Sequence, residues 1–371
     1  MLSVAIIGCG AIAPTHAKAL ALDGRSAVTW ACDPDLVKAK TAFPAARITA
    51  DWRQALADSG VDLVCVCTPH AQHAEQVIAA LAAGKHVICE KPLATTPADV
   101  ERMVAAADAG TRRAKPLIAA AIFQHRYNPL TARLHQLLRD GEFGEVRHAT
   151  MDFRCTRSRA YYASGPWRGR WDGEGGALLI NQAIHTFDLV NWFCGTPLAV
   201  SGVVERRLLG DAIECEDWAK ARVHYAGGAE AEILAANDQV TGWQTDISVQ
   251  GTRGSFALGA GYALTQLAHP SQVVQSELRA IDRIRDEVVK LPGKSEYGDH
   301  HALQIADVVG AIIAGRRPRV TLADGAASIH AVLGIYASSA QGGIDVALHA
   351  APAHWRQPIL HPSTAPALQG T

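Results

Sequence analysis

The fold is decided by the stretch VAIIGCGAIA, residues 4–13. Its apolar first half predicts a β-strand, and the residues that follow it predict a helix. A GxGxx(G/A) pattern between a strand and a helix is typical of dinucleotide-binding βαβ units. Gly8 would permit the tight turn, Gly10 would let a pyrophosphate approach the backbone, and Ala13 would let the helix pack closely on the strand. Ala11 and Ile12 complete the expected cofactor loop, although a glycine turn also occurs in α/β domains that bind nothing.

Short apolar runs recur on both sides of helix-like segments through the first third of the chain, at residues 4–7, 27–32, 47–50, 63–67, 86–89 and 117–122. This alternation predicts a doubly wound parallel sheet, a Rossmann domain, over residues 1–125. Longer alternating stretches follow, including residues 219–225 and 229–233 around Gly227-Gly228, which predict an antiparallel hairpin. We therefore expect an α+β domain with a largely antiparallel open sheet over residues 126–349, and a Pro/Ala-rich tail over 350–371.

Composition is that of an ordinary globular protein and gives no support for a binder of nucleic acid or membrane. The chain has 371 residues, 35 Lys+Arg against 36 Asp+Glu and a net charge of −1, so it offers no electrostatic attraction for polyanions. No apolar stretch approaches the ~20 residues of a membrane span. Met1 leads straight into the apolar run of residues 4–7 without a basic n-region or cleavage site, so no leader is expected. Eight cysteines without a CxxC pair suggest reduced thiols in the cytoplasm.

The spacing of histidines and cysteines gives no metal-binding motif, so no metal site is expected. His16, on the first helix, is expected to pack structurally. The adjacent His300 and His301 are expected to point to different helix faces.

Asp33 ends the second predicted strand, twenty residues after Ala13. An acceptor for the adenosine ribose hydroxyls belongs at this place, and its carboxylate would repel a 2′-phosphate, so we expect NAD rather than NADP. The alternatives are that Asp33 is only a turn residue before proline, or that Lys38 or Arg53 folds over to serve a phosphate.

Several further motifs occur in a specific order: Thr68-Pro69 with His73, then Glu90-Lys91-Pro92, then Gly175-Gly176-Ala177-Leu178 leading to His185 and Asp188. Together with the glycine loop they resemble the glucose-fructose oxidoreductase/inositol dehydrogenase (Gfo/Idh/MocA) family over nearly the whole chain. The resemblance implies an NAD(P)-dependent dehydrogenase that oxidises a secondary hydroxyl of a sugar, glycoside or cyclitol. It implies further cofactor contacts from Thr68, Pro69, His73, Glu90, Lys91, Trp167 and Arg168.

Lys91 stands at the carboxyl end of a parallel strand, where open α/β sheets bind ligands. Its ammonium could bond a substrate hydroxyl and stabilise charge on that oxygen, and the resemblance makes it the catalytic lysine. Asn181, His185 and Asp188 are spaced i, i+4 and i+7, which predicts one shared helix face. An imidazole can accept the hydroxyl proton, and His185 matches the catalytic histidine of the family. Without the resemblance, a solvated Lys91 and a structural His185 would be the simpler interpretations.

Asn181 departs from the pattern, because many members of the family carry aspartate there. An asparagine can orient a hydroxyl but adds no charge to tune its neighbours. The strings NQAIH, residues 181–185, and QHRYNP, residues 124–129, look like those of UDP-sugar and other pyranoside 3-dehydrogenases. We expect substrate contacts from Gln124, Arg126, Tyr161 and Asp188, of which Asp188 could instead orient His185.

Two other functions fit the same fold, because fold does not fix chemistry. One is an NAD-dependent glycosidase that oxidises its substrate only transiently, and the other is a non-catalytic NAD sensor. The open sheet of the second domain suggests a homodimer or homotetramer.

Overall fold

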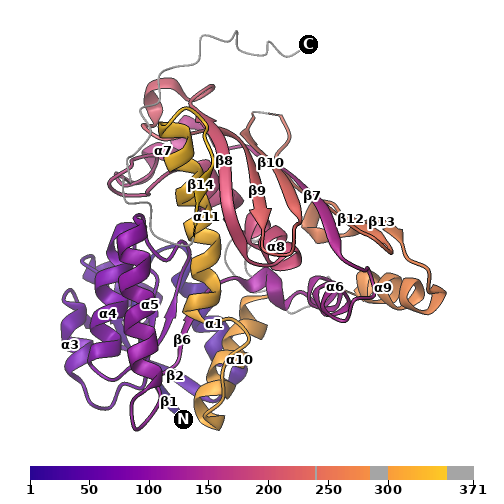
Figure 1. Cartoon of the computed structure of the whole chain (residues 1–371). Coiled ribbons are helices and arrows are strands. Elements are labelled where there is room, and N and C mark those ends of the chain that lie inside the picture. Colours follow the sequence, from indigo (N-terminus) through magenta and orange to yellow (C-terminus); the bar gives the residue numbers. More distant parts are fainter. Residues whose placement is uncertain (239, 285–299, 349–371) are drawn as a thin grey trace. The chain divides into compact units, whose positions relative to one another are not determined.

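The computed structural model describes residues 1–238, 240–284 and 300–348 (Figure 1). These residues divide into two compact units. The first holds Met1–Ala94, Ala98–Tyr127 and residues 300–326, and the second holds Thr95–Pro97, the described part of 128–284 and residues 327–348. The domain boundaries expected at residues 125 and 349 stay predictions, and the expected tail at 350–371 lies outside the described residues.

The first unit is built on a six-stranded sheet in which every pairing is parallel, with the order β3-β2-β1-β4-β5-β6. Its strands are β1 (Leu2–Ile7), β2 (Ser26–Cys32), β3 (Arg47–Thr49), β4 (Leu63–Val66), β5 (His86–Cys89) and β6 (Ala119–Ala121). Its helices are α1 (Ala13–Asp23), α2 (Leu36–Ala42), α3 (Trp52–Ala57), η1 (His70–Gln72), α4 (His73–Ala82), α5 (Pro97–Thr111), η2 (Gln124–Tyr127) and α10 (His301–Ala314). The predicted Rossmann sheet is confirmed.

The core of this sheet explains why its strands are continuous apolar runs. All four residues of β4 are buried, as are the last four of β1, because helices cover both faces of a parallel sheet. The helix α10 completes the unit by packing on α1 (Figure 1). Its Gln304 amide accepts the Phe123 N–H at 3.1 Å and donates to the Ala121 carbonyl at 2.7 Å. A late segment of the chain therefore fixes the edge strand β6.

The second unit is an eight-stranded sheet with the order β13-β12-β11-β7-β10-β9-β8-β14. Its strands β7 and β10 pair in parallel, and the other described pairs are antiparallel. Its strands are β7 (Val146–Cys155), β8 (Pro197–Glu205), β9 (Trp218–Tyr225), β10 (Glu230–Asn237), β11 (Trp243–Gly251), β12 (Ser255–Leu258), β13 (Leu264–Ala268) and β14 (Val346–Ala347). Its helices are α6 (Pro129–Arg139), α7 (Arg159–Ala163), η3 (Leu178–Ala183), α8 (Ile184–Cys194), η4 (Gly210–Ala212), η5 (Ala260–Tyr262), α9 (Gln272–Ile284) and α11 (Leu322–Ala340). The largely antiparallel sheet and the β9–β10 hairpin at Gly227-Gly228 are confirmed.

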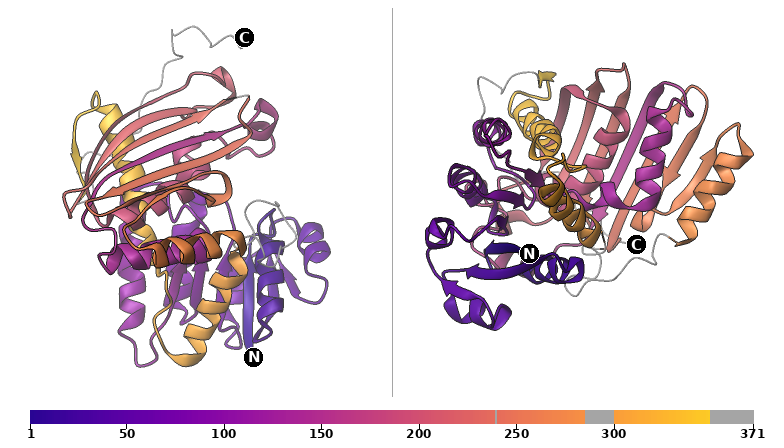
Figure 2. Two further views of the ribbon diagram at one scale, coloured as in Figure 1. Left: turned by 90° about the vertical axis from the view of Figure 1, so that its right-hand side faces the viewer. Right: turned by 90° about the horizontal axis from the view of Figure 1, so that it is seen from below.

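Among the described residues, one face of this second sheet is buried and the other is accessible or half-buried. Side chains alternate between buried and accessible along β7, β9 and β10, the pattern of a sheet covered on one side. The helix α8 covers the buried face over β7, β10 and β11, and Figure 2 shows the strands of this sheet lying side by side. No helix among the described residues is long and apolar enough to cross a membrane.

Candidate functional site

The glycine loop between β1 and α1 has the geometry that a dinucleotide requires. Gly8 has φ +89°, and a Cβ there would lie 2.7 Å from the Cys67 carbonyl carbon and oxygen, so only glycine fits. A Cβ on Gly10 would meet no atom within 4 Å, which leaves the backbone approachable. Ala13 begins α1 and is fully buried. A tight turn, an approachable backbone and close packing of the helix are features that a pyrophosphate site needs, and cofactor contacts at these positions stay a prediction.

Asp33 follows β2 and lies against this loop. Its Oδ2 accepts the Cys9 N–H at 2.8 Å, and its Oδ1 accepts the Asp35 N–H at 3.0 Å. Lys38, one of the two cations weighed from the sequence, places its Nζ 3.4 Å from Asp33 Oδ2, while Arg53 pairs with other carboxylates. The carboxylate therefore lies against the glycine loop with one lysine beside it, and its contact with ribose hydroxyls stays a prediction.

His73 joins the loops that follow β4 and β5. Its Nδ1 lies 2.7 Å from the Pro92 carbonyl oxygen and its Nε2 lies 2.8 Å from the Thr68 carbonyl oxygen. Burial lowers the pKa of His73, although both carbonyl contacts favour its charged form. The imidazole thus holds together the two loops that carry the Thr68-Pro69 and Glu90-Lys91-Pro92 motifs.

Glu90 and Lys91 follow the end of β5 and differ in environment. The Glu90 carboxylate is buried, and its Oε1 lies 2.8 Å from His16 Nε2 and 3.4 Å from His301 Nε2. Burial raises the pKa of this carboxyl, but the two imidazoles outweigh that effect and hold the pKa well below its ordinary value. Lys91 is half-buried. The other carboxylate oxygen of Glu90, Oε2, accepts the Lys91 N–H at 3.3 Å, and cofactor contacts by Glu90 stay a prediction.

Gln124 and Arg126 lie on η2 in the first unit. Gln124 is fully buried, and Arg126 is nearly so, with its Nη2 donating to the Asp324 carbonyl at 3.4 Å. In the described conformation both side chains are packed inside the unit. Their expected contacts with substrate stay predictions.

In the second unit, the motif Gly175-Gly176 is explained by close packing. Both residues have positive φ, and a Cβ on Gly176 would lie 2.2 Å from the Tyr336 hydroxyl oxygen. That hydroxyl donates to Glu216 Oε1 at 2.7 Å. Glu216 also accepts the N–H groups of Ala177 at 3.1 Å and Leu179 at 2.9 Å. A buried carboxylate, whose pKa burial raises to about 7, therefore holds the start of the next helix.

That helix corrects one expectation from the sequence. Residues 178–183 form the π-helix η3, and the α-helix α8 begins only at Ile184. The wider i→i+5 turn changes the angular position of Asn181, so the three residues do not lie on one continuous α-helix as the spacing had predicted. His185 is buried in the first turn of α8. Asp188 is also buried, and its Oδ1 accepts the Ser328 hydroxyl at 2.8 Å.

Sequence reasoning missed Glu174, which fixes Asn181. Its carboxylate accepts a hydrogen bond from the Asn181 side-chain amide and another from the Gly169 N–H. Glu174 is fully buried, and burial raises its pKa to about 7. The sequence does contain a signal for this residue, because Glu174 is an acidic residue between the glycines of GEGG, residues 173–176.

An aromatic and arginine cluster lies on α7 and on the loop that follows it. The Tyr161 hydroxyl accepts from Arg168 Nη1 at 2.6 Å and from Gln182 Nε2 at 3.0 Å. The Arg168 guanidinium carbon lies 4.4 Å from the centre of the Tyr161 ring and 4.5 Å from that of Trp167. The sequence predicted Tyr161, Trp167 and Arg168 as site residues but not Gln182 or Arg157, which stacks on Tyr161 at 4.9 Å. Half-buried aromatic faces with polar edges suit a polar ring ligand.

Comparisons with known proteins agree with this architecture. A family model described as an oxidoreductase family with an NAD-binding Rossmann fold matches residues 2–115, and the GFO/IDH/MocA C-terminal domain matches residues 131–257. Inositol 2-dehydrogenase of Acidothermus cellulolyticus is 30% identical over 262 residues, 69% of this chain and 72% of that protein. Levoglucosan dehydrogenase of Pseudarthrobacter phenanthrenivorans is 29% identical over 62% of this chain, and the match spans 58% of that enzyme.

A solved structure extends the similarity to almost the whole chain. The WlbA dehydrogenase from Bordetella pertussis, in complex with NADH and UDP-GlcNAcA, superposes with a TM-score of 0.85 and 25% identity. The match covers 93% of this chain and 97% of that one. The first three curated relatives are each matched over 58% of their own length.

Proposed function

Because this chain belongs to the Gfo/Idh/MocA family of NAD-binding oxidoreductases, we propose that it oxidises a secondary hydroxyl of a sugar, glycoside or cyclitol with NAD. The observation that carries the proposal is the glycine loop with Asp33 against it, which fits the adenosine half of the cofactor. The sugar and cyclitol dehydrogenases among the relatives support the substrate class.

The reaction needs a hydride acceptor, which nicotinamide supplies when it is bound. On the protein side, His185 accepts the proton of the substrate hydroxyl at an imidazole nitrogen as the carbon–hydrogen bond breaks. Lys91 donates a hydrogen bond to the same oxygen and stabilises the charge that develops there. The oxidised carbon loses a hydride and the oxygen loses a proton, so a ketone results.

Asn181 orients a substrate hydroxyl in this proposal. Its amide nitrogen donates to the Glu174 carboxylate, and the carbonyl oxygen of an amide is a group that can accept from a substrate hydroxyl. Trp167 and Arg168 contact the nicotinamide end of the cofactor, and Tyr161 contacts the substrate. Their stacking and hydrogen bonds hold these side chains in place before a ligand arrives.

The proposed activity is tested by NADH formation with purified protein and a panel of inositols, free hexoses, glycosides and a UDP-hexuronate. We expect absorbance of NADH with at least one class of compound. Hydrolysis of a glycoside without net NADH would instead show the transient oxidation of a glycosidase. Binding of NAD with no reaction on any compound would indicate a sensor.

Substitution of the two loop glycines should separate folding from cofactor binding. Gly8→Ala forces a side chain into backbone at 2.7 Å with positive φ and should lower the free energy of unfolding by about 1–3 kcal/mol. Gly10→Ala adds a methyl group where no atom lies within 4 Å, so stability should hold. The added methyl group should nevertheless crowd the pyrophosphate and weaken the binding of NAD by about 1.4 kcal/mol or more. This loss corresponds to a rise in Kd of about tenfold or more.

Denaturant unfolding and calorimetric titration with NAD measure the two quantities. Equal loss of stability in both variants, or unchanged NAD affinity in Gly10→Ala, would contradict the proposed position of the pyrophosphate.

Asp33 should set the preference for NAD over NADP. Wild-type protein should have the higher kcat/KM with NAD. Asp33→Ala should lower kcat/KM with NAD by about 10- to 100-fold. The variant loses a hydrogen bond between the cofactor and a charged group, and such a bond contributes about 1.5–3 kcal/mol. The variant should also improve the use of NADP, because Lys38 stands beside the vacated position. Asp108→Ala, an exposed carboxylate on α5, is the matched control, and a wild-type preference for NADP would refute this role.

Two broader proposals accompany the activity. The accessible face of the second unit's sheet is where copies of the chain would associate into a homodimer or homotetramer, which light scattering can measure.

All eight cysteines lie among the described residues and are free and buried, which supports a reducing compartment such as the cytoplasm.

A further inference from the structure

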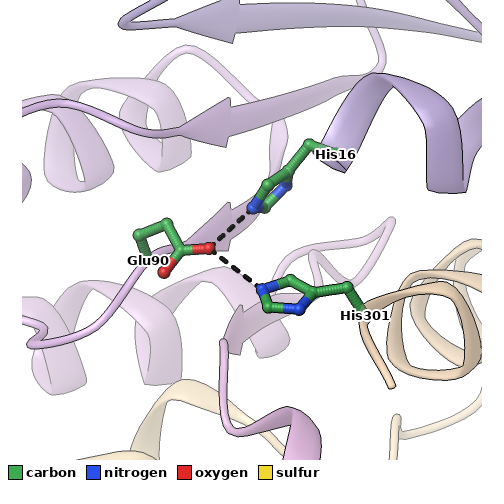
Figure 3. A group of neighbouring side chains, drawn as sticks. All are labelled: His16, Glu90 and His301. Carbon is green, nitrogen blue, oxygen red and sulfur yellow. Dashed lines mark hydrogen bonds and ion pairs between the residues drawn. The ribbon is translucent and has the colours of Figure 1, made fainter. Parts of the chain in front are cut away.

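Three titratable side chains from distant parts of the sequence meet inside the first unit (Figure 3). His16 comes from α1, Glu90 follows β5, and His301 is the first residue of α10. Their side chains are 0%, 8% and 2% exposed, respectively. One potential ligand atom from each residue lies within 4.8 Å of the other two.

The hydrogen bonds within this group leave polar atoms unsatisfied. His16 Nε2 lies at hydrogen-bonding distance, 2.8 Å, from Glu90 Oε1. His301 Nε2 approaches the same oxygen at 3.4 Å without hydrogen-bond geometry. Among the described residues, His301 Nδ1 has no hydrogen-bond partner, and its Nε2 has only the long contact with Glu90. A buried imidazole that is so poorly satisfied is costly and calls for an explanation.

We propose that this group is a structural binding site for a divalent transition-metal ion, with zinc as the best match. Two imidazoles and one carboxylate are ligands that zinc takes in proteins. Ligand atoms about 2.0–2.1 Å from a tetrahedral ion stand roughly 3.3 Å apart. The separations of 2.8 and 3.4 Å at Glu90 Oε1 are close to that value, and an ion would satisfy His301 Nε2. The ion would join α1, the end of β5 and α10. Glu90, one of its ligands, immediately precedes Lys91 in the sequence.

The burial of the three side chains gives the ion a structural role rather than a catalytic one, because a substrate has no direct access to it. Sequence spacing could not reveal the site, because 74 residues separate His16 from Glu90 and more than 200 separate Glu90 from His301. This inference does not depend on the dehydrogenase proposal, because the ion can be measured whether or not any substrate is found.

The test uses full-length protein stripped with a chelator and then titrated with Zn²⁺ or Co²⁺. We expect uptake of one equivalent per chain, a rise in Tm with metal concentration and a visible Co²⁺ spectrum. His301→Gln should abolish the uptake and the rise in Tm. His224→Ala removes a more accessible histidine that pairs with Glu230 at 3.1 Å and should leave both unchanged.

X-ray absorption of the zinc-loaded wild type makes the test independent of how well a variant folds. The proposal predicts two histidine nitrogens about 2.0–2.1 Å from the metal. No stoichiometric uptake by the wild type, uptake that persists in His301→Gln, or a metal with fewer than two histidine ligands would each overturn it.

Discussion

His185→Ala should lower kcat by about 10²- to 10⁴-fold, the range that general-base catalysis contributes. The imidazole is buried in the first turn of α8, so the variant also removes packing, and turnover must be compared at equal folded fraction. KM for NAD should change little, because most of the expected cofactor contacts lie in the first unit and His185 is not one of them. Added imidazole should restore part of the lost rate, an effect that a purely structural histidine would not show.

His148→Ala is the matched control for this experiment. His148 lies on β7, on the accessible side of the sheet, and its removal should leave kcat unchanged. If His185→Ala retains wild-type turnover, or if imidazole fails to restore any activity in a folded variant, another group must take the proton.

Lys91→Met should lower kcat by about 10²- to 10³-fold, comparable to the loss of one donor that stabilises a developing oxyanion. Methionine keeps most of the length of the side chain and removes only the ammonium. The half-buried position of Lys91 at the end of β5 means that folding should be retained. NAD affinity should fall far less than turnover, because the glycine loop and Asp33 are untouched.

Lys115→Met gives the corresponding control, since Lys115 is exposed and belongs to the same unit. Steady-state kinetics and NAD titration on the three proteins separate the effects. A Lys91→Met variant with normal kcat and weakened NAD binding would make Lys91 a cofactor contact only.

Much of the fold is predictable because buried parallel strands are short apolar runs. Residues 86–89 were expected as a strand and form β5 with the same bounds. The two-glycine turn at 227–228 was likewise expected from local pattern. In both places neighbouring residues determine the structure, either through burial on both sides or through the conformation that glycine permits.

The parts that could not be predicted depend on residues far apart in sequence. The π-helix η3 begins where Glu216, some 40 residues later, binds the backbone at Ala177 and Leu179. Periodicity alone gave an ordinary helix there. The pairing of Glu90 with His16 and His301 was hidden for the same reason, because the return of α10 to the first unit leaves no local pattern.

The central claim, net transfer of a hydride from a secondary carbinol carbon to nicotinamide, is tested most directly by isotope tracing. Purified protein is incubated with NAD and substrates of the panel deuterated at their ring carbons, and both products are examined by mass spectrometry. The account predicts one deuterium in each reduced cofactor and an equal amount of keto product. A hydrolysed glycoside with no deuterated NADH, or bound NAD with no labelled product from any compound, would contradict it.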